Sequence, residues 1–223
     1  MVIKKIPIIV VCGATASGKT ALSIEIAREF GGEIVSADSM QIYRHMDIGS
    51  AKPTIEERRG VEHHMIDILE PTESFSAAQY AEMAHKCIYD IYSRKRLPVM
   101  AGGTGLYINS VINDVDFSDE DNSDGKLRDE LTRIYEENGA EYLHEMLRVV
   151  DEKSAEKIHA NNVKRVIRAI EFYRLNNKKL SEHSDEGKLK ESRYMPVMLE
   201  ISWDRAELYE RINRRVDIMF EAG

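Results

Sequence analysis

The sequence feature that most restricts the fold of this chain is a glycine-rich loop close to its start. Residues 13–20 read Gly-Ala-Thr-Ala-Ser-Gly-Lys-Thr, a phosphate-loop pattern in which four residues separate two glycines, with Lys and Thr after the second. An apolar run at 6–12 enters the loop, and a helical pattern leaves it. In such a loop, consecutive backbone N–H groups converge on phosphate oxygens at a helix N-terminus. The loop therefore predicts a strand–loop–helix unit that binds a phosphorylated ligand.

Two side chains of this phosphate loop add to its chemistry. The Lys19 ammonium is expected to neutralise a terminal phosphate, and the Thr20 hydroxyl to be a ligand of Mg²⁺, the predicted cofactor. The residues predicted to bind a diphosphate or nucleotide are Gly13, Ala14, Thr15, Ala16, Ser17, Gly18, Lys19 and Thr20.

Length, cysteine content and charge narrow the class of protein. At 223 residues the chain can bury one full core and a smaller subdomain. Two cysteines are too few for a disulfide framework, and no apolar run approaches the roughly 20 residues that cross a bilayer. We therefore expect a cytoplasmic protein without a membrane partner. The net charge of −8 argues weakly against nucleic acid, but residues 161–180 hold six basic residues and one acid.

Alternating strand and helix patterns predict an α/β fold. Besides the first apolar run, buried strands are expected at 33–36, 97–101 and 196–201. Helices are expected at 19–30, with Leu22, Ile26 and Phe30 on one stripe, and at 76–94, which opens with a Ser-x-x-Gln capping box. Strands that alternate with helices of this length form a parallel sheet with right-handed crossovers.

The strand signal disappears between residues 114 and 193. Polar segments at 116–125 and 181–192 are expected to be loops, and the core resumes at 196, followed by a helix at 205–219. The helices expected within the insertion cover 126–138, 140–149, 152–158 and 163–175. The predicted fold is thus a P-loop-type core with a mostly parallel sheet, formed by residues 1–113 and 194–223, with a helical insertion at 114–193.

Several branches of phosphate-loop proteins can be tested against the sequence. The chain has no Asn-Lys-x-Asp for reading guanine, and the strand at 97–101 ends in Gly-Gly-Thr-Gly rather than in the acid that motor ATPases use. The strand at 33–36 instead leads to Asp38, a carboxylate at the sheet edge where α/β proteins place their ligands. Asp38 is therefore a candidate functional residue rather than only a helix cap.

These blocks resemble the tRNA dimethylallyltransferase family. The likeness covers nearly the whole chain, and the Asp38 block combined with the Gly-Gly-Thr-Gly block is its most specific part. Ala14 stands where family loops usually have proline, and family members normally continue well past the position of Gly223. The matching segments are residues 13–20, 33–44, 46–53, 64–67, 75–78, 102–107, 157–159, 162–171 and 208–212.

The resemblance implies a reaction and a set of site residues. Family members transfer a dimethylallyl group from dimethylallyl diphosphate to N6 of adenosine 37 in tRNA, so the loop would bind a diphosphate leaving group. Asp38 would be the general base, Thr104 would contact the substrate near the reacting oxygen or the tRNA, and Arg215 would stabilise the diphosphate. Arg211, one helical turn away, remains the alternative to Arg215 because spacing alone does not separate them.

The resemblance also implies where tRNA would bind. The chain is expected to be a monomer. A charge run on a helix is usually a solvated face, and only the family match favours RNA contact for the basic segment at 164–168. The segment at 114–124, which holds six carboxylates and no basic residue, is expected to lie away from RNA. The implied tRNA-contacting residues are Asp38, Ser39, Met40, Gln41, Thr104, Arg128, Lys164, Arg165, Val166, Ile167 and Arg168.

Two other readings stay open at this point. The loop would also suit a small-molecule kinase that uses ATP, and a truncated tRNA-binding fragment would bind RNA without turnover. The pair His63-His64 with Asp67 suggests a metal site, but no further ligand follows at convincing spacing, which favours structural or surface roles. Trp203 is expected to be a packing residue near the last strand.

Overall fold

The computed structural model describes residues 5–114, 125–182 and 192–221. The chain divides into two compact units, one formed by residues 1–114 with 192–223 and the other by 115–191. We call them the core unit and the helical unit. Most of the two loops expected at 116–125 and 181–192 lies outside the described residues.

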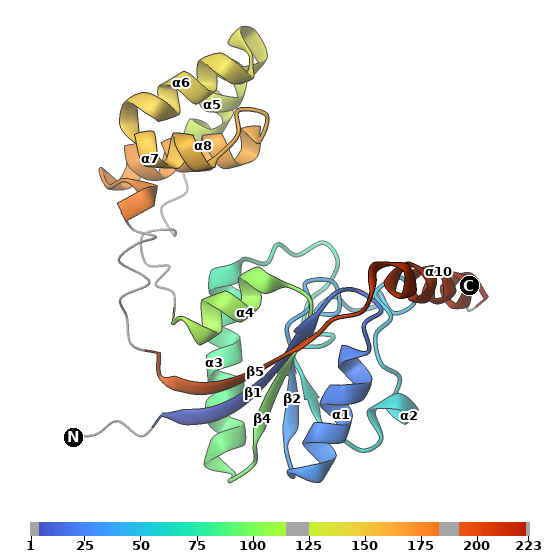
Figure 1. The fold of residues 1–223 in the computed structure, drawn as a ribbon. Helices are drawn as coiled ribbons and strands as arrows, with labels where there is room; N and C mark the ends of the chain where they lie inside the picture. Colours follow the sequence, from blue (N-terminus) through green and yellow to red (C-terminus); the bar gives the residue numbers. More distant parts are fainter. Residues whose placement is uncertain (1–4, 115–124, 183–191, 222–223) are drawn as a thin grey trace. The chain divides into compact units, whose positions relative to one another are not determined.

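The core unit is built on a five-stranded sheet with the order β3-β2-β4-β1-β5 (Figure 1). All four strand pairs are parallel, which confirms the predicted α/β class with a parallel sheet. The two-residue strand β3 was not predicted, because so short a segment carries no period-2 pattern. The strands are β1 (Ile6–Gly13), β2 (Glu33–Ser36), β3 (His63–His64), β4 (Pro98–Ala101) and β5 (Tyr194–Ile201).

Helices cover both faces of this sheet. The crossover through α1 (Lys19–Glu29) runs from β1 to β2, and the one through α3 (Ala77–Ser93) runs back towards β4. Crossovers of one hand that run in opposite directions place their helices on opposite faces, as Figure 1 shows for α1 and α3. The predicted capping box at Ser76 and Gln79 is confirmed. The short helices α2 (Ile55–Arg58) and α4 (Gly105–Ile112) were not predicted.

Of the predicted apolar stripe of α1, only Ile26 packs against the core. Leu22 is 37% exposed and Phe30 is 64% exposed, whereas Ser23, Ile24 and Ala27 are buried. Ile24 and Ala27 pack in one cluster with residues of β1, β2 and β4. Small side chains at 23 and 27 allow the helix to approach the sheet closely, and this close fit outweighs the larger apolar residues on the other side.

The last helix, α10 (Arg205–Glu221), carries no fully buried residue. Leu208, Ile212 and Met219 of its predicted apolar face are half-buried. Val216 is 42% exposed. The helix nevertheless brings three arginines to the functional cleft described below.

The helical unit has its own core and confirms the predicted helical insertion. Its central side chains come from α5, α6 and α8, and include Leu131, Leu143 and Ile170. The carboxylate of Asp151 is buried and accepts hydrogen bonds from backbone N–H and hydroxyl groups of Ser154 and Ser181. The helices are α5 (Gly125–Asn138), α6 (Ala140–Val150), α7 (Glu152–Lys157) and α8 (Val163–Asn176).

Among the described residues, no helix has the length and apolar character to cross a membrane.

Candidate active site

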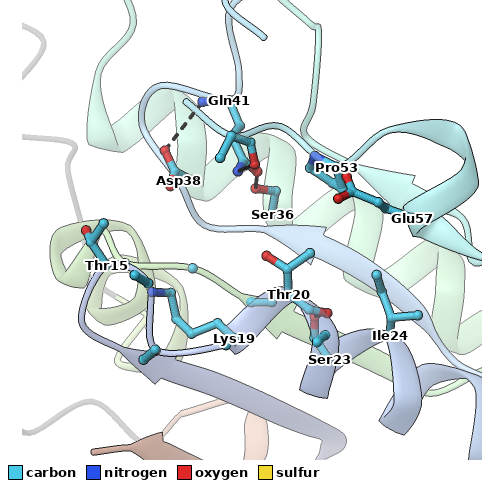
Figure 2. A pocket seen from close by; sticks show the side chains of 18 of the residues that line it. Thr15, Lys19, Thr20, Ser23, Ile24, Ser36, Asp38, Gln41, Pro53 and Glu57 are labelled. Atoms are coloured by element: carbon cyan, nitrogen blue, oxygen red, sulfur yellow. Dashed lines mark hydrogen bonds between the residues drawn. The ribbon is translucent and has the colours of Figure 1, made fainter. Parts of the chain in front are cut away.

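A cleft of ≈ 720 Å³ opens at the carboxyl edge of the sheet, within the core unit (Figure 2). The phosphate loop and the first turns of α1 form one wall of the cleft. Asp38 and Gln41, which follow β2, line it together with the glycines that follow β4. α10 contributes Arg211, Arg214 and Arg215. The cleft therefore joins the predicted phosphate loop, the predicted base and both candidate arginines.

Backbone geometry explains the glycines at the two ends of the phosphate loop. Gly13 and Gly18 have φ angles of +145° and +102°, a region that L side chains rarely adopt. A Cβ atom at Gly13 would also lie 2.6 Å from the carbonyl oxygen of Ile201. Gly18 is the N-cap of α1 and offers no side-chain hydrogen bond to the first turn. The amides of that turn are thus left to an external acceptor such as a phosphate.

The Lys19 side chain folds back over its own loop. Its Nζ donates to the carbonyl oxygens of Gly13, at 3.0 Å, and Ala14, at 2.6 Å. Burial and the neighbouring charge of Arg215 lower the pKa of Lys19, while Asp38 acts in the opposite direction. Two cations close together in a partly buried cleft repel each other, and an anion bound between them would relieve that repulsion.

Asp38 follows β2 and is fixed by its own turn. Its Oδ1 accepts hydrogen bonds from the backbone N–H group of Met40, at 2.9 Å, and from that of Gln41, at 3.4 Å (Figure 2). No group in the described part of the chain donates a hydrogen bond to Oδ2. One carboxylate oxygen therefore orients the side chain, and the other remains available to accept a proton.

The segments that follow β2 and β4 are locked together. A Cβ atom at Gly102 would lie 2.1 Å from the carbonyl oxygen of Ala37, so only glycine fits there. The Thr104 backbone N–H donates to that same carbonyl at 3.0 Å, and Thr104 Oγ1 accepts from the backbone N–H of Ser39 at 3.0 Å. Thr104 thus holds the turn that carries Asp38. It does not belong to the cleft lining, and neither do Ser39 and Met40.

The two candidate arginines of α10 have different partners. Arg211 Nε donates to the carbonyl oxygen of Ala16 in the phosphate loop, at 2.9 Å. Arg215 donates through Nη2 to the carbonyl oxygen of Ser50, at 3.2 Å. Its buried Nε has no hydrogen-bond partner in the described part of the chain. Arg211 therefore binds the phosphate loop, whereas Arg215 binds the rim that carries Ser50.

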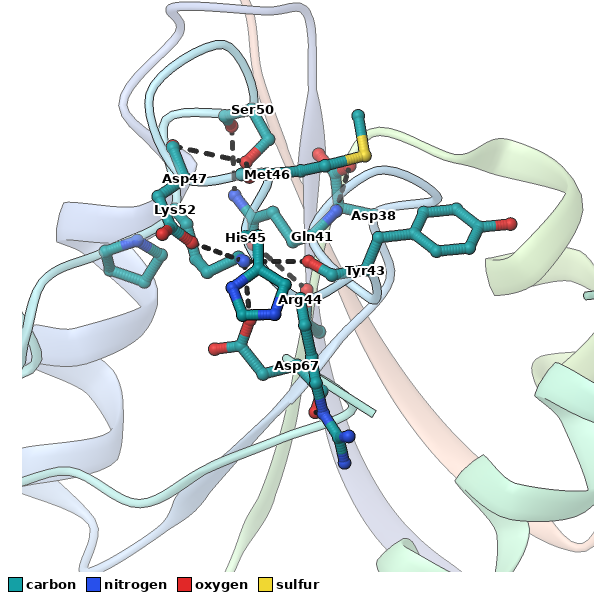
Figure 3. A network of polar contacts seen from close by, with 12 residues as sticks. Asp38, Gln41, Tyr43, Arg44, His45, Met46, Asp47, Ser50, Lys52 and Asp67 are labelled. Carbon is teal, nitrogen blue, oxygen red and sulfur yellow. Dashed lines mark hydrogen bonds and ion pairs between the residues drawn. The ribbon is translucent and has the colours of Figure 1, made fainter. Parts of the chain in front are cut away.

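A buried lysine supports the rim of the cleft, and the sequence interpretation missed it (Figure 3). Lys52 is 8% exposed, and its Nζ donates to the Tyr43 carbonyl oxygen at 2.8 Å and to the carboxylates of Asp47 and Asp67 at 2.6 and 2.5 Å. The nearby Ser50 carbonyl accepts from Arg215 and, at 3.4 Å, from Gln41. The sequence did contain a signal for this lysine, because Lys52 lies in the segment 46–53 that resembles the tRNA dimethylallyltransferase family.

The two histidines of β3 both have hydrogen-bond partners within the protein. His64 Nε2 pairs with the buried carboxylate of Glu33 at 2.7 Å, and His63 Nδ1 contacts the Val61 carbonyl oxygen. No group of three or more His, Cys, Asp or Glu residues that could hold a metal occurs within residues 5–114, 125–182 and 192–221.

The predicted tRNA-contacting residues of the helical unit differ in exposure, since some are exposed and others are buried in its core. Lys164, Arg165 and Arg168 are exposed on α8. Val166 and Ile167 are 0% and 7% exposed and belong to the core of the unit. The side chains of Val166 and Ile167 therefore serve this core, and a contact of these two residues with RNA stays a prediction. Arg128 is half-exposed, and its Nη2 pairs with the buried Glu171 carboxylate at 2.6 Å.

Comparison with known proteins places this site in a family. The profile of the family described as IPP transferase matches residues 41–223. A tRNA dimethylallyltransferase of Acetivibrio thermocellus is 52% identical over 216 residues, which is 97% of this chain and 69% of that protein. The chain belongs to the IPP transferase family. A tRNA dimethylallyltransferase of Clostridioides difficile is 47% identical over 99% of this chain and 70% of its own length.

Solved structures of the IPP transferase family share the fold. A tRNA isopentenylpyrophosphate transferase from Bacillus halodurans has a TM-score of 0.66 and 44% identity, covering 98% of this chain and 67% of the other. A eukaryotic dimethylallyltransferase acting on tRNA has a TM-score of 0.84 and 31% identity, covering 98% of this chain and 54% of the other. The chain thus spans about two thirds of the length of its bacterial relatives.

Proposed function

We infer that this chain transfers a dimethylallyl group from dimethylallyl diphosphate to N6 of adenosine 37 in tRNA. The observation that carries this inference is one cleft that combines a phosphate loop with an oriented carboxylate, Asp38. Membership in a family whose members are named for this transfer decides against the kinase reading.

The leaving group would be held by the loop side of the cleft. Breaking the bond between C1 of the dimethylallyl group and the diphosphate oxygen builds negative charge on that oxygen. The uncapped first turn of α1, Lys19 and Arg215 all line the cleft in which this charge would develop. Interactions that strengthen as charge builds lower the barrier rather than only tighten substrate binding.

The residues present would suit Mg²⁺ bound through the substrate. Mg²⁺ usually keeps several waters and binds through substrate phosphates with few protein ligands. Thr20 lines the cleft in the first turn of α1 and is the residue that would contribute its hydroxyl. When bound, the ion would neutralise part of the diphosphate charge.

The nucleophile would be activated on the opposite side of the cleft. The exocyclic amine of adenine is a weak nucleophile and must lose a proton as its nitrogen bonds to C1. We assign that proton to Oδ2 of Asp38, since Oδ1 is already held by the turn. The target base would have to leave its stack to reach the cleft, which an anticodon loop permits at small cost.

The helical unit would contribute binding energy for RNA. Lys164, Arg165 and Arg168 present three cationic groups from one exposed region of α8. Contacts of this kind with phosphates release counterions, so tRNA binding should weaken steeply as salt rises.

A direct transfer assay tests the proposed function. Labelled dimethylallyl diphosphate is incubated with the protein and unmodified tRNA, beside an active full-length relative. We expect label in tRNA, and melting temperatures raised by dimethylallyl diphosphate more than by ATP. Salt-sensitive tRNA binding without any labelled product, while the relative is active, would instead identify a tRNA-binding fragment.

A further inference from the structure

Two residues outside the phosphate loop hold its backbone from the C-terminal part of the core unit. Trp203 Nε1 donates to the Ser17 carbonyl oxygen at 2.8 Å, and Arg211 Nε donates to the adjacent Ala16 carbonyl oxygen at 2.9 Å. The Arg211 guanidinium also lies over the Trp203 ring, 4.2 Å from its centroid. Trp203 is 41% exposed and does not belong to the cleft lining. It therefore grips the loop from a side that no cleft ligand would cover.

With these contacts, four carbonyl oxygens of the phosphate loop each accept a hydrogen bond from a side chain. Lys19 binds those of Gly13 and Ala14, whereas Arg211 and Trp203 bind those of Ala16 and Ser17. A trans peptide points its C=O and N–H in opposite directions. Each anchored carbonyl therefore fixes the direction of the next amide, and the Ser17 carbonyl fixes that of Gly18 at the start of α1.

The backbone at this point needs external support. Ala16 has a φ angle of +62°, a left-handed conformation that is unfavourable for a residue with a Cβ atom. Such a conformation persists only where surrounding contacts impose it, and Arg211 binds the carbonyl of this same residue.

We propose that Trp203 and Arg211 form a loop latch, a pair of positioning residues that keeps the phosphate-loop amides directed at the diphosphate. The proposal rests on the proposed function for the identity of that ligand. The latch touches no reacting atom. It raises the fraction of molecules whose loop is ready to bind, and apparent affinity scales with that fraction.

Binding of inorganic pyrophosphate by calorimetry tests the loop latch in the full chain. Trp203→Phe keeps an aromatic ring under Arg211 but removes the indole N–H, and we expect about fivefold weaker binding, the equivalent of one hydrogen bond. Arg211→Met should act in the same direction, and Arg211→Lys should recover part of the loss. Tyr209→Phe, which removes a hydroxyl from an exposed tyrosine of α10, is the matched control and should bind as wild type.

Fluorescence supplies a second readout, because Trp203 is the sole tryptophan of the chain. Pyrophosphate should change the wild-type emission, since the indole N–H is bonded to the loop that receives the ligand. Thermal unfolding without ligand checks that each variant is folded. Unchanged pyrophosphate affinity in folded Trp203→Phe and Arg211→Met would overturn the latch and leave the proposed function standing. Wild-type protein that fails to bind pyrophosphate would overturn both.

Discussion

Replacing Lys52 by methionine should destabilise the core unit through loss of a buried charge. Methionine keeps most of the apolar stem but removes an ammonium that donates to one carbonyl and two carboxylates. Hydrogen bonds to charged groups contribute about 1.5–3 kcal/mol each. The Asp47 and Asp67 side chains are 65% and 42% exposed, so water will replace part of what they lose. We expect a net loss of about 3 kcal/mol in the free energy of unfolding.

Thermal and urea unfolding measure this loss. A loss of about 3 kcal/mol corresponds to a fall of roughly 6–12 °C in melting temperature for a chain of this size. Lys86→Met is the matched control, because Lys86 is 72% exposed and pairs with Glu82 across one helical turn. Exposed pairs of this kind contribute less than about 0.5 kcal/mol. The KM for dimethylallyl diphosphate should also rise in Lys52→Met, since the displaced rim carries the carbonyl that Arg215 uses.

The pH dependence gives the sharpest test of this reasoning. Burial alone would lower the pKa of Lys52, but the hydrogen bonds to Asp47 and Asp67 raise it above its ordinary value. A raised pKa means that the stabilisation is complete at neutral pH and is lost only as pH rises through that value. The difference between wild type and Lys52→Met should therefore be constant from pH 7 to about 9. A difference below about 1 kcal/mol, or one that disappears within this range, would refute the assignment.

Three further predictions concern the base, the RNA contact and acid stability. Asp38→Ala should reduce single-turnover transfer by at least about 100-fold while tRNA binding is unchanged, and full transfer would exclude Asp38 as the base. Lys164→Ala with Arg168→Ala should weaken tRNA binding and flatten its salt dependence in filter binding, whereas an alanine substitution on α7 should not. Hydrogen bonds from Arg94 lower the pKa of Glu33 to about 2. That stabilisation is present above the ordinary carboxylate pKa and is lost as pH falls towards 2, so Glu33→Gln should flatten the acid limb of stability measured by urea unfolding.

The parts of the fold that could be predicted are those written in local sequence. The phosphate loop is a fixed pattern, the strands β1, β2, β4 and β5 are apolar runs, and the capping box of α3 is a four-residue signal. Elements such as β3 carry no such signal, since it is two residues long and exists because β2 offers it an edge. Its place in the sheet is set by tertiary pairing rather than by local preference.

The two wrong or missed features, the buried face of α1 and the buried Lys52, have a common physical cause. Size and polarity can be read from a sequence, but how side chains pack against one another cannot. In α1 the larger apolar residues Leu22 and Phe30 suggested the buried stripe, yet the sheet accepts the side with Ser23 and Ala27. Lys52 would be read as a surface residue from its type alone, because lysine is rarely buried without partners. Its partners stand 5 and 15 residues away, and only the fold brings both carboxylates to one ammonium.

The choice between Arg211 and Arg215 shows what the structure adds to a motif. Both residues lie one turn apart on α10 and both line the cleft, so neither spacing nor membership of the lining separates them. Their hydrogen-bond partners do, because each guanidinium directs its N–H donors from one fixed plane. Arg211 directs its Nε at the phosphate loop and stacks on Trp203, which fixes its plane. Arg215 instead directs its Nη2 at the Ser50 carbonyl oxygen on the rim of the cleft. We therefore propose Arg215 as the residue that binds the diphosphate and Arg211 as the residue that holds the phosphate loop.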